Sequence, residues 1–534
     1  MKIRHLLVVG LLLFSTFVFA QSKQNNKNSA PASVSWGPDV EGSRKSIINK
    51  IIGHDEDYYY VLFEEVSGMF GRKTYYIEKY DLKMKQLASE EIILDGSSKK
   101  REFESVIYFN DEIYLLSSYN DKKQDFKYLY IQHVDKSNLI PEKKLTQIAD
   151  IDYNEYRQSD FGSFLYEVSA DSSKLFFHYI LPSKKKMKQK FGLKVFDKEL
   201  SLLWEKNITV PYLDELFWTQ SYRIDNDGNI YILAKVYKDK VRDKRKGKPN
   251  YKYQLITVKN NGEEYKEYPV ELKDKFITDL QIEVNSNMDI VCGGFYSKIG
   301  TYSIDGCCFL NIDGQTGDVR TKSTKEFDLE FLTQDLTDRQ KKRIQRKTAR
   351  GRDLELYEYN LDHLVIREDG GVLMVGEQYW VEVHTYTDAN GITHTYYEYN
   401  YNDIFIVNVN PEGKIDWAQK IPKRQTTTSD PLYFSYSFAT VGNDLYFIYN
   451  DHEDNIDYEG DGEIKTLKSV KNSFTMLAHV DSEGNISIDP LFKNERGKAY
   501  LLPLACQQVS SDEVIAYAKR GKMEKFAKIK YTIE

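Results

Sequence analysis

The sequence predicts an all-β protein built from eight repeats of a four-stranded antiparallel sheet. Its 534 residues include 41 Tyr, 27 Phe and 5 Trp but only 8 Met, and an aromatic apolar content favours strands over helices. A polar turn followed by an apolar, aromatic strand recurs eight times, beginning at Asp55, Asn110, Asp171, Asn226, Asn285, Glu368, Gly442 and Ser511. Tandem sheets of this size protect their edges by closing radially. The predicted fold is therefore a β-propeller, with seven blades as the alternative count.

The first twenty residues are predicted to be a secretory signal peptide. Lys2 and Arg4 precede an apolar run over 6–14, and VFA at 18–20 has the small-residue pattern of a cleavage site. An uncleaved anchor is the alternative, but the apolar run is short and no basic stop-transfer segment follows it. We therefore expect cleavage after Ala20, a polar linker over 21–32 and a propeller over 33–534. The mature protein is expected to be periplasmic or secreted, without a transmembrane segment.

The remaining strands of each repeat follow one order along the chain. A next strand ends in a polar turn at Asp81, Asp135, Asp197, Asn260, Asp313, Asn410 and Asp481, and a further strand follows each turn. The last repeat stops at Glu534 without its outermost strand. VSWGPDV at 34–40 matches the outer strands around Trp204 and Trp417. The N-terminal segment is therefore predicted to supply the missing strand and to close the ring.

Five long segments interrupt the repeats, at 183–190, 238–252, 322–359, 381–399 and 451–468. Each of them joins the second strand of a repeat to the third, or the fourth strand to the next repeat. Because neighbouring strands run antiparallel, all these connections lie at the same end of the sheets. One face of the disc is therefore predicted to carry every large insertion. This face is the predicted functional face, because loops held by a rigid scaffold carry most binding residues.

A short basic helix is predicted within the segment 322–359, capped by Thr337-Asp338 and stopped by Gly351. Together with two lysine-rich loops on the same face, it would attract an anionic partner. The predicted basic partner-binding residues are Arg339, Lys341, Lys342, Arg343, Arg346, Lys347, Arg350, Lys185, Lys186, Arg242, Lys244 and Arg245. Solvated loops without a partner are the alternative. The formal net charge of −7 argues against nucleic-acid binding.

The segment 381–399 is predicted to be an extended hairpin that turns at Asn390-Gly391. The aromatic residues predicted to contact a protein or a glycan are Trp380, Tyr386, Tyr396 and Tyr397. Simple packing of the hairpin on its neighbours is the alternative. His384 and His394 face the same side only if the loop has an odd number of residues. No third ligand for a zinc ion is evident, so no metal site is predicted.

Acidic and thiol groups provide two further ligand candidates. DHEDNIDYEGDGE at 451–463 holds seven carboxylates, but Lys468 stands where a helix–loop–helix calcium site requires a glutamate. Looser calcium binding is the alternative, and no cofactor is predicted. Among the four cysteines, a disulfide from Cys292 to Cys307 or Cys308 is one interpretation. Buried free thiols are the favoured interpretation, because cysteine is a small core residue.

Two glycine-containing strands carry a family resemblance. DGGVLMVG at 369–376 and DIVCGG at 289–294 resemble the DGG-apolar-G repeats of secreted bacterial β-propeller proteins, and the repeats cover nearly all of the chain after the leader. The resemblance implies a fold and no particular activity. The sequence lacks Trp-Asp blade endings, sialidase Asp-boxes and YWTD repeats, so the activities of those subfamilies do not carry over.

The sequence contains none of the common catalytic motifs G-x-S-x-G, H-E-x-x-H, Walker A or C-x-x-C. A carboxylate pair can hydrolyse a glycosidic bond without a motif. A glycan hydrolase or lyase with carboxylates near the central channel is therefore the alternative function. The favoured function is a non-catalytic scaffold that binds a protein at the envelope or outer membrane, as a periplasmic component of an outer-membrane or secretion translocon assembly.

Overall fold

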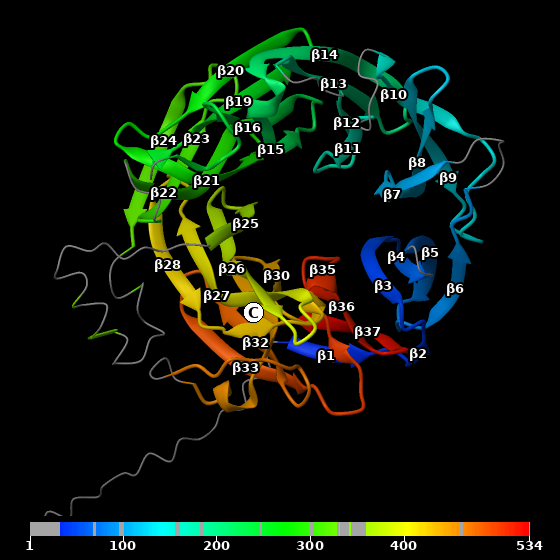
Figure 1. The fold of residues 1–534 in the computed structure, drawn as a ribbon, viewed down its shortest axis with the longest axis vertical. Coiled ribbons are helices and arrows are strands. Elements are labelled where there is room, and N and C mark those ends of the chain that lie inside the picture. Colours follow the sequence, from blue (N-terminus) through cyan, green and yellow to red (C-terminus); the bar gives the residue numbers. More distant parts are fainter. Residues whose placement is uncertain are drawn as a thin grey trace, which may run out of the picture.

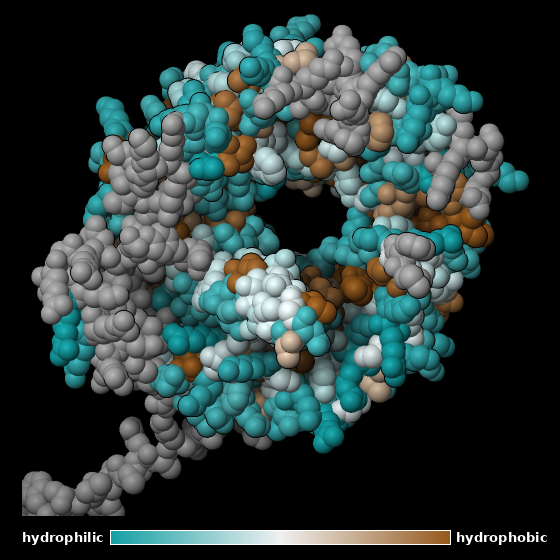
Figure 2. Space-filling model, viewed as in Figure 1, coloured by the Kyte–Doolittle hydropathy of each residue, from teal (hydrophilic) through white to brown (hydrophobic). Residues whose placement is uncertain are grey.

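The protein is an eight-bladed β-propeller in the computed structural model, which describes residues 32–67, 71–94, 101–154, 161–181, 186–245, 248–299, 304–327, 331, 341–342, 346, 359–458 and 463–532. Eight antiparallel sheets stand around a central channel (Figure 1), and the channel is open in the space-filling view (Figure 2). The predicted fold class and the count of eight blades are confirmed. The predicted leader and most of the predicted linker lie outside the described residues.

The first four blades contain four strands each, ordered from the channel outwards as they occur along the chain (Figure 1). Blade 1 contains β3 (Ser46–His54), β4 (Tyr58–Ser67), β5 (Arg72–Asp81) and β6 (Gln86–Glu91). Blade 2 contains β7 (Glu102–Phe109), β8 (Glu112–Asp121), β9 (Phe126–Val134) and β10 (Thr146–Asp152). Blade 3 contains β11 (Ser163–Val168), β12 (Lys174–Ile180), β13 (Lys188–Asp197) and β14 (Leu202–Leu213). Blade 4 contains β15 (Phe217–Ile224), β16 (Ile230–Tyr237), β19 (Tyr251–Lys259) and β20 (Glu264–Val270).

The other four blades include two with extra strands. Blade 5 contains β21 (Lys275–Val284), β22 (Ile290–Lys298), β23 (Gly306–Ile312) and β24 (Val319–Glu326). Blade 6 contains β25 (Tyr359–Ile366), β26 (Val372–Thr387), β27 (Thr393–Val409), β28 (Ile415–Ile421) and β29 (Gln425–Thr427). Blade 7 contains β30 (Tyr436–Val441), β31 (Asp444–Asp451), β32 (Phe474–Val480) and β33 (Ile486–Lys493). Blade 8 contains β34 (Tyr500–Leu501), β35 (Gln507–Gln508), β36 (Glu513–Arg520), β37 (Met523–Tyr531), β1 (Ala32–Trp36) and β2 (Val40–Glu41).

The eight turn-and-strand repeats of the sequence form the second strand of each blade. This strand lies inside its sheet and between two neighbouring blades, which is why all eight residues of β16 are buried. The turn before it is set by a side chain: Asp225 Oδ1 accepts hydrogen bonds from the N–H groups of Asp227 (3.0 Å) and Asn229 (2.8 Å). Asp and Asn favour such turns because they bond to the nearby backbone. The repeat therefore predicted these strands correctly.

The N-terminal strand closes the ring, as the sequence predicted. β1 pairs antiparallel with β37, with Val34 opposite Ile529 and Trp36 opposite Ala527. Ala32 is buried in the apolar layer between blades 7 and 8. The Trp36 indole lies 5.1 Å from the Phe492 ring, in an edge-to-face arrangement. The outermost strand of the last blade thus comes from the other end of the chain.

Apolar cores fill the spaces between blades, and the thiols belong to these cores. Cys292 and Cys308 lie in the layer between blades 4 and 5, whereas Cys307 lies in the layer between blades 5 and 6. Adjacent residues of a strand point to opposite faces, which separates Cys307 from Cys308. All four cysteines, including Cys506, are free thiols. The structure thus bears out the favoured interpretation over the cross-strand disulfide.

The long connections lie at one end of the blades, because they join second to third strands or fourth to first strands of the antiparallel sheets. β24 extends to Glu326 and β25 begins at Tyr359, so residues 322–326 belong to the outer strand of blade 5. Of the following connection, residues 331, 341, 342 and 346 are described as helical. In the part of the chain that the structure describes, no helix is long and apolar enough to cross a membrane.

Candidate functional site

A long hairpin of blade 6 extends from the face that carries the insertions. β26 and β27, with 16 and 17 residues, are the longest described strands. Their segments 372–377 and 403–409 are buried in the blade, whereas most of 381–399 is exposed. We call residues 379–401 the blade 6 hairpin. Figure 2 shows pale spheres of intermediate hydropathy beside the central opening, in the region where Figure 1 places β26 and β27.

The turn of the blade 6 hairpin matches the sequence prediction. Asp388 Oδ1 accepts hydrogen bonds from the N–H groups of Asn390 (2.9 Å) and Ile392 (3.0 Å). Gly391 has φ of 80°, a left-handed conformation that glycine adopts without steric cost. The loop 388–392 has an odd number of residues, so His384 and His394 do lie on the same face of the hairpin.

A buried ion pair anchors the base of the blade 6 hairpin. Lys423 Nζ lies 2.5 Å from Glu377 Oε1, and the two side chains are 0% and 5% exposed. The ammonium also donates to the Tyr401 carbonyl (3.2 Å) and to Gln425 Oε1 (3.3 Å), while Ser435 Oγ donates to Glu377 Oε2 (2.7 Å). Burial raises the pKa of Glu377, and the neighbouring ammonium opposes that shift. The pair is thus stabilised by hydrogen bonds that satisfy both charged groups.

The anchor continues as a polar network into blades 7 and 8. Gln425 Nε2 donates to the Asn450 carbonyl (2.6 Å), and Asn450 Nδ2 donates to the carbonyls of Tyr433 (2.9 Å) and Leu501 (3.0 Å). An apolar cluster covers the network, with Tyr401, Phe434, Leu467, Val470 and Tyr500 buried and Tyr379, Tyr399 and Tyr433 partly buried. The hairpin therefore stands on a base that joins three blades.

The two faces of the blade 6 hairpin differ in chemistry. One face, here the ladder face, carries Trp380, Glu382, His384, Tyr386, His394, Tyr396 and Glu398. On it the rings of His384 and Tyr396 stack at 4.9 Å, and those of Tyr386 and His394 at 5.0 Å. The opposite face, here the valine face, carries Val381, Val383 and Tyr397. Val383 and Tyr397 are 59% and 50% exposed.

The structure gathers most of the predicted aromatic residues. Tyr386 and Tyr396 lie on the ladder face and are exposed, whereas Tyr397 lies on the valine face. Trp380 is partly buried at the base, where its indole N–H donates to Glu382 Oε1 (3.0 Å). His394 Nε2 lies 3.0 Å from Asp388 Oδ2, so it is engaged by the turn and does not reach His384. The two histidines therefore do not share one site.

The predicted basic residues are only partly within the described chain. Arg339, Arg343, Lys347, Arg350 and Lys185 lie outside the described residues. Lys342, Arg346, Lys186 and Arg242 are exposed and Lys341 is partly buried. Lys244 and Arg245 form β17, which pairs with β18 (Lys248–Pro249). Their shared binding surface therefore stays a prediction.

A charged cluster that was not predicted from the sequence lies on the innermost strands of blades 3, 4 and 5. Arg223 on β15 lies 2.6 Å from a carboxylate oxygen of Glu283 on β21 and 3.8 Å from one of Glu167 on β11. All three side chains are between 24% and 29% exposed. Burial raises the pKa of Glu167 to about 8, with Arg223 lowering it and Glu283 raising it. Each residue stands two positions before the first residue of the hydrogen-bonded turn that follows its strand, which is Ser169, Asp225 or Asn285. This regularity could have identified the cluster.

The raised pKa of Glu167 predicts a pH-dependent stability. The folded protein holds a proton that the unfolded chain releases near pH 4.5, so the free energy of unfolding should fall as pH rises from 5 towards 8. Glu167 contributes up to about 1.4 kcal/mol per pH unit to this fall. Urea unfolding at pH 5, 6, 7 and 8 should show a smaller fall for Glu167→Gln. Equal slopes for the wild type and the variant would contradict the assignment.

Among known proteins, this chain resembles solved structures in fold shape only. No protein-family model and no curated protein matches the sequence. The β-propeller domain of the Trilobed protease from Pyrococcus furiosus is 9% identical, with 92% of this chain and 97% of that chain covered and a TM-score of 0.35. An oligogalacturonate lyase in complex with manganese is 10% identical, with coverages of 94% and 97% and a TM-score of 0.37. A polysaccharide lyase is also 10% identical, with coverages of 90% and 89% and a TM-score of 0.37.

These similarities carry no argument about activity. The assignment of the fold rests on the eight sheets of the protein itself. The two candidate functional regions are the blade 6 hairpin and the charged cluster at the innermost strands.

Proposed function

We propose that this protein is an exported, non-catalytic β-propeller that binds a protein partner through the blade 6 hairpin. The main support for this proposal is that the blade 6 hairpin exposes apolar and aromatic side chains. Its base, in contrast, is buried and held by the Glu377–Lys423 ion pair and an apolar cluster. Because that base fixes the hairpin before binding, little conformational entropy is lost when a partner docks. The secretory leader pattern supports a partner in the envelope, as in a periplasmic component of an outer-membrane or secretion translocon assembly.

The valine face favours a protein partner over a glycan. Val383 and Ile392 are 59% and 57% exposed, and Tyr397 adds an exposed ring opposite Val383. Glycan binding uses flat aromatic surfaces and hydrogen bonds, whereas exposed aliphatic side chains gain free energy only when another apolar surface covers them. The proposed contact therefore centres on the valine face and the tip of the hairpin.

We expect loss of partner capture when the exposed side chains of the hairpin are made polar. The variant Val383→Ser, Tyr386→Ser and Tyr397→Ser should bind the partner at least about tenfold more weakly, because central apolar and aromatic contacts carry most of the binding energy. Tagged wild-type and variant proteins are applied to gently solubilised envelopes, and the recovered partner is quantified. Its affinity for each purified protein is then measured.

The matched control changes two exposed leucines on the outer strand of blade 3, Leu202→Ser and Leu203→Ser, which should leave capture unchanged. A second comparison replaces Arg339, Lys342, Arg343 and Arg346 with Gln, which measures the contribution of the basic segment. Equal capture by the wild type and the hairpin variant would refute the proposed contact.

A glycan hydrolase or lyase is the second candidate function, and the charged cluster favours it. A carboxyl group with a pKa near 8 holds a proton at neutral pH, as a general acid requires. Glu283, in contrast, is held by Arg223 at 2.6 Å, which weakens it as a nucleophile. Turnover of acidic or neutral polysaccharides that is lost in Glu167→Gln and retained in the hairpin variant would establish this function in place of the scaffold.

A further inference from the structure

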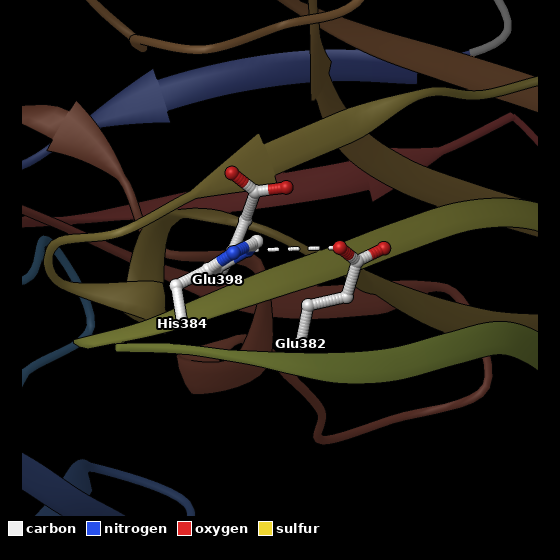
Figure 3. Close-up of side chains that lie close together, drawn as sticks. All are labelled: Glu382, His384 and Glu398. Carbon is white, nitrogen blue, oxygen red and sulfur yellow. Dashed lines mark ion pairs between the residues drawn. The ribbon is translucent and has the colours of Figure 1, made fainter. Parts of the chain in front are cut away.

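We propose that Glu382, His384 and Glu398 form a zinc site on the ladder face of the blade 6 hairpin (Figure 3). Glu382 and His384 are two residues apart on β26 and therefore point to the same face. Glu398 lies directly opposite Glu382 on β27. One imidazole and two carboxylates thus converge from two paired strands. The inference concerns the protein alone and does not depend on the proposed partner.

The distances suit three ligands of one ion better than a hydrogen-bonded cluster. One ligand atom from each residue lies within 4.8 Å of the other two. His384 Nε2 stands 3.6 Å from Glu382 Oε2, which is too long for a hydrogen bond. Two atoms that each bind a tetrahedral zinc ion at about 2.0–2.1 Å are about 3.4 Å apart. Small side-chain rotations would therefore bring the ligands to bonding distance.

A buried nitrogen without a hydrogen bond supplies a further reason for a ligand. The imidazole of His384 is 37% exposed as a whole, yet its Nε2 atom is buried and has no hydrogen-bond partner among the described residues, with Glu382 Oε2 at ion-pair distance only. Burying a polar atom removes its hydrogen bonds to water, and the free-energy cost is not offset unless the atom gains another partner. A metal ion between Nε2 and the two carboxylates would satisfy this atom.

The two facing carboxylates of the cluster also favour binding of a cation. Glu382 and Glu398 are directly opposite, and like charges in this position destabilise a strand pair. Among the described residues, no lysine or arginine forms an ion pair with either carboxylate. A divalent ion would convert this repulsion into attraction on both strands.

Neighbouring side chains orient two of the three ligands. The Trp380 indole N–H binds Glu382 Oε1 at 3.0 Å, which leaves Oε2 free to face His384. The Tyr396 ring stacks on the imidazole with an interplanar angle of 19°. Groups that orient ligands in this way commonly strengthen metal binding.

The ligand set selects the kind of ion. Calcium and magnesium prefer sites made only of oxygen atoms, whereas zinc binds imidazole together with carboxylates. Three protein ligands leave the fourth tetrahedral position for water or for a group of another molecule. The zinc ion would then lie on the ladder face of the blade 6 hairpin, with one coordination position left for a further ligand.

The test is zinc binding by the metal-stripped, full-length mature protein, followed by isothermal titration with zinc chloride. We expect one zinc ion per chain, and a d–d absorption band of tetrahedral type when cobalt replaces zinc. Glu382→Gln, His384→Gln and Glu398→Gln should each weaken zinc binding at least about tenfold. The hairpin lies outside the blade cores, so circular dichroism should show that each variant is folded.

His394→Gln is the matched control, because His394 lies on the same face but outside the cluster. It should bind zinc like the wild type. The site is overturned if the wild type binds no zinc, if His394→Gln loses as much affinity as His384→Gln, or if calcium binds to the three residues and His384→Gln has no effect.

Discussion

Replacing Lys423 with methionine is expected to lower the free energy of unfolding by about 3–5 kcal/mol. The substitution leaves the Glu377 carboxylate buried without its countercharge, and Ser435 Oγ then provides its remaining side-chain hydrogen bond. The loss should shrink at pH 5, because burial already raises the pKa of Glu377 and the carboxyl group can then take up a proton. Urea unfolding of the mature protein at pH 5 and pH 8 measures both effects.

The double variant Glu377→Met and Lys423→Met provides the control. Two apolar side chains need no countercharge, so the double variant should recover most of the stability lost in the single variant. A single variant as stable as the wild type would mean that the pair is not buried as described. Recovery in the double variant would show that the damage comes from the unpaired charge and not from lost packing.

Removing residues 32–41 is expected to open the ring, with a loss of about 1.5–6 kcal/mol in the free energy of unfolding. The estimate follows from burial of one or two apolar side chains of β1, at about 1.5–3 kcal/mol each. The edge of β37 would then be exposed along its length, and exposed edges pair with other chains. Thermal unfolding and light scattering after size exclusion should therefore show a lower Tm and self-association.

A synthetic peptide of residues 32–41, added in trans, should return the Tm and the association state of the truncated protein to those of the full chain. The peptide with Val34→Asp should not, because Val34 packs against the layer between blades 7 and 8. If the truncated protein kept both the Tm and the association state of the full chain, β1 would not stabilise the ring.

The fold was predictable because its signal repeats. Polar turns such as the one at Asp225 mark the second strand of every blade, and the match of Trp36 to Trp204 and Trp417 identified the strand that closes the ring. These features depend on local turn chemistry and on strand periodicity, both of which are visible in a sequence.

The contents of the candidate site were harder to predict because they depend on register. Placing His384 and Glu398 on the same face of the hairpin requires knowledge that β26 and β27 are joined by a five-residue loop, since a shift of one residue turns every side chain to the opposite face. The Glu377–Lys423 pair depends in addition on a bulge in β26 and on the connection between β28 and β29, which carries Lys423. No local pattern encodes either contact.

The pairing of β1 with β37 also bears on how the chain reaches its native state. The two strands are separated by almost the entire chain, so their pairing is a contact of the highest sequence separation in the protein. During synthesis the first strand has no partner until the last blade has emerged. Seven blades can form from local hairpins, but the eighth waits for both termini. We therefore expect ring closure to be the last and slowest step of folding, with two sheet edges open to aggregation until it occurs.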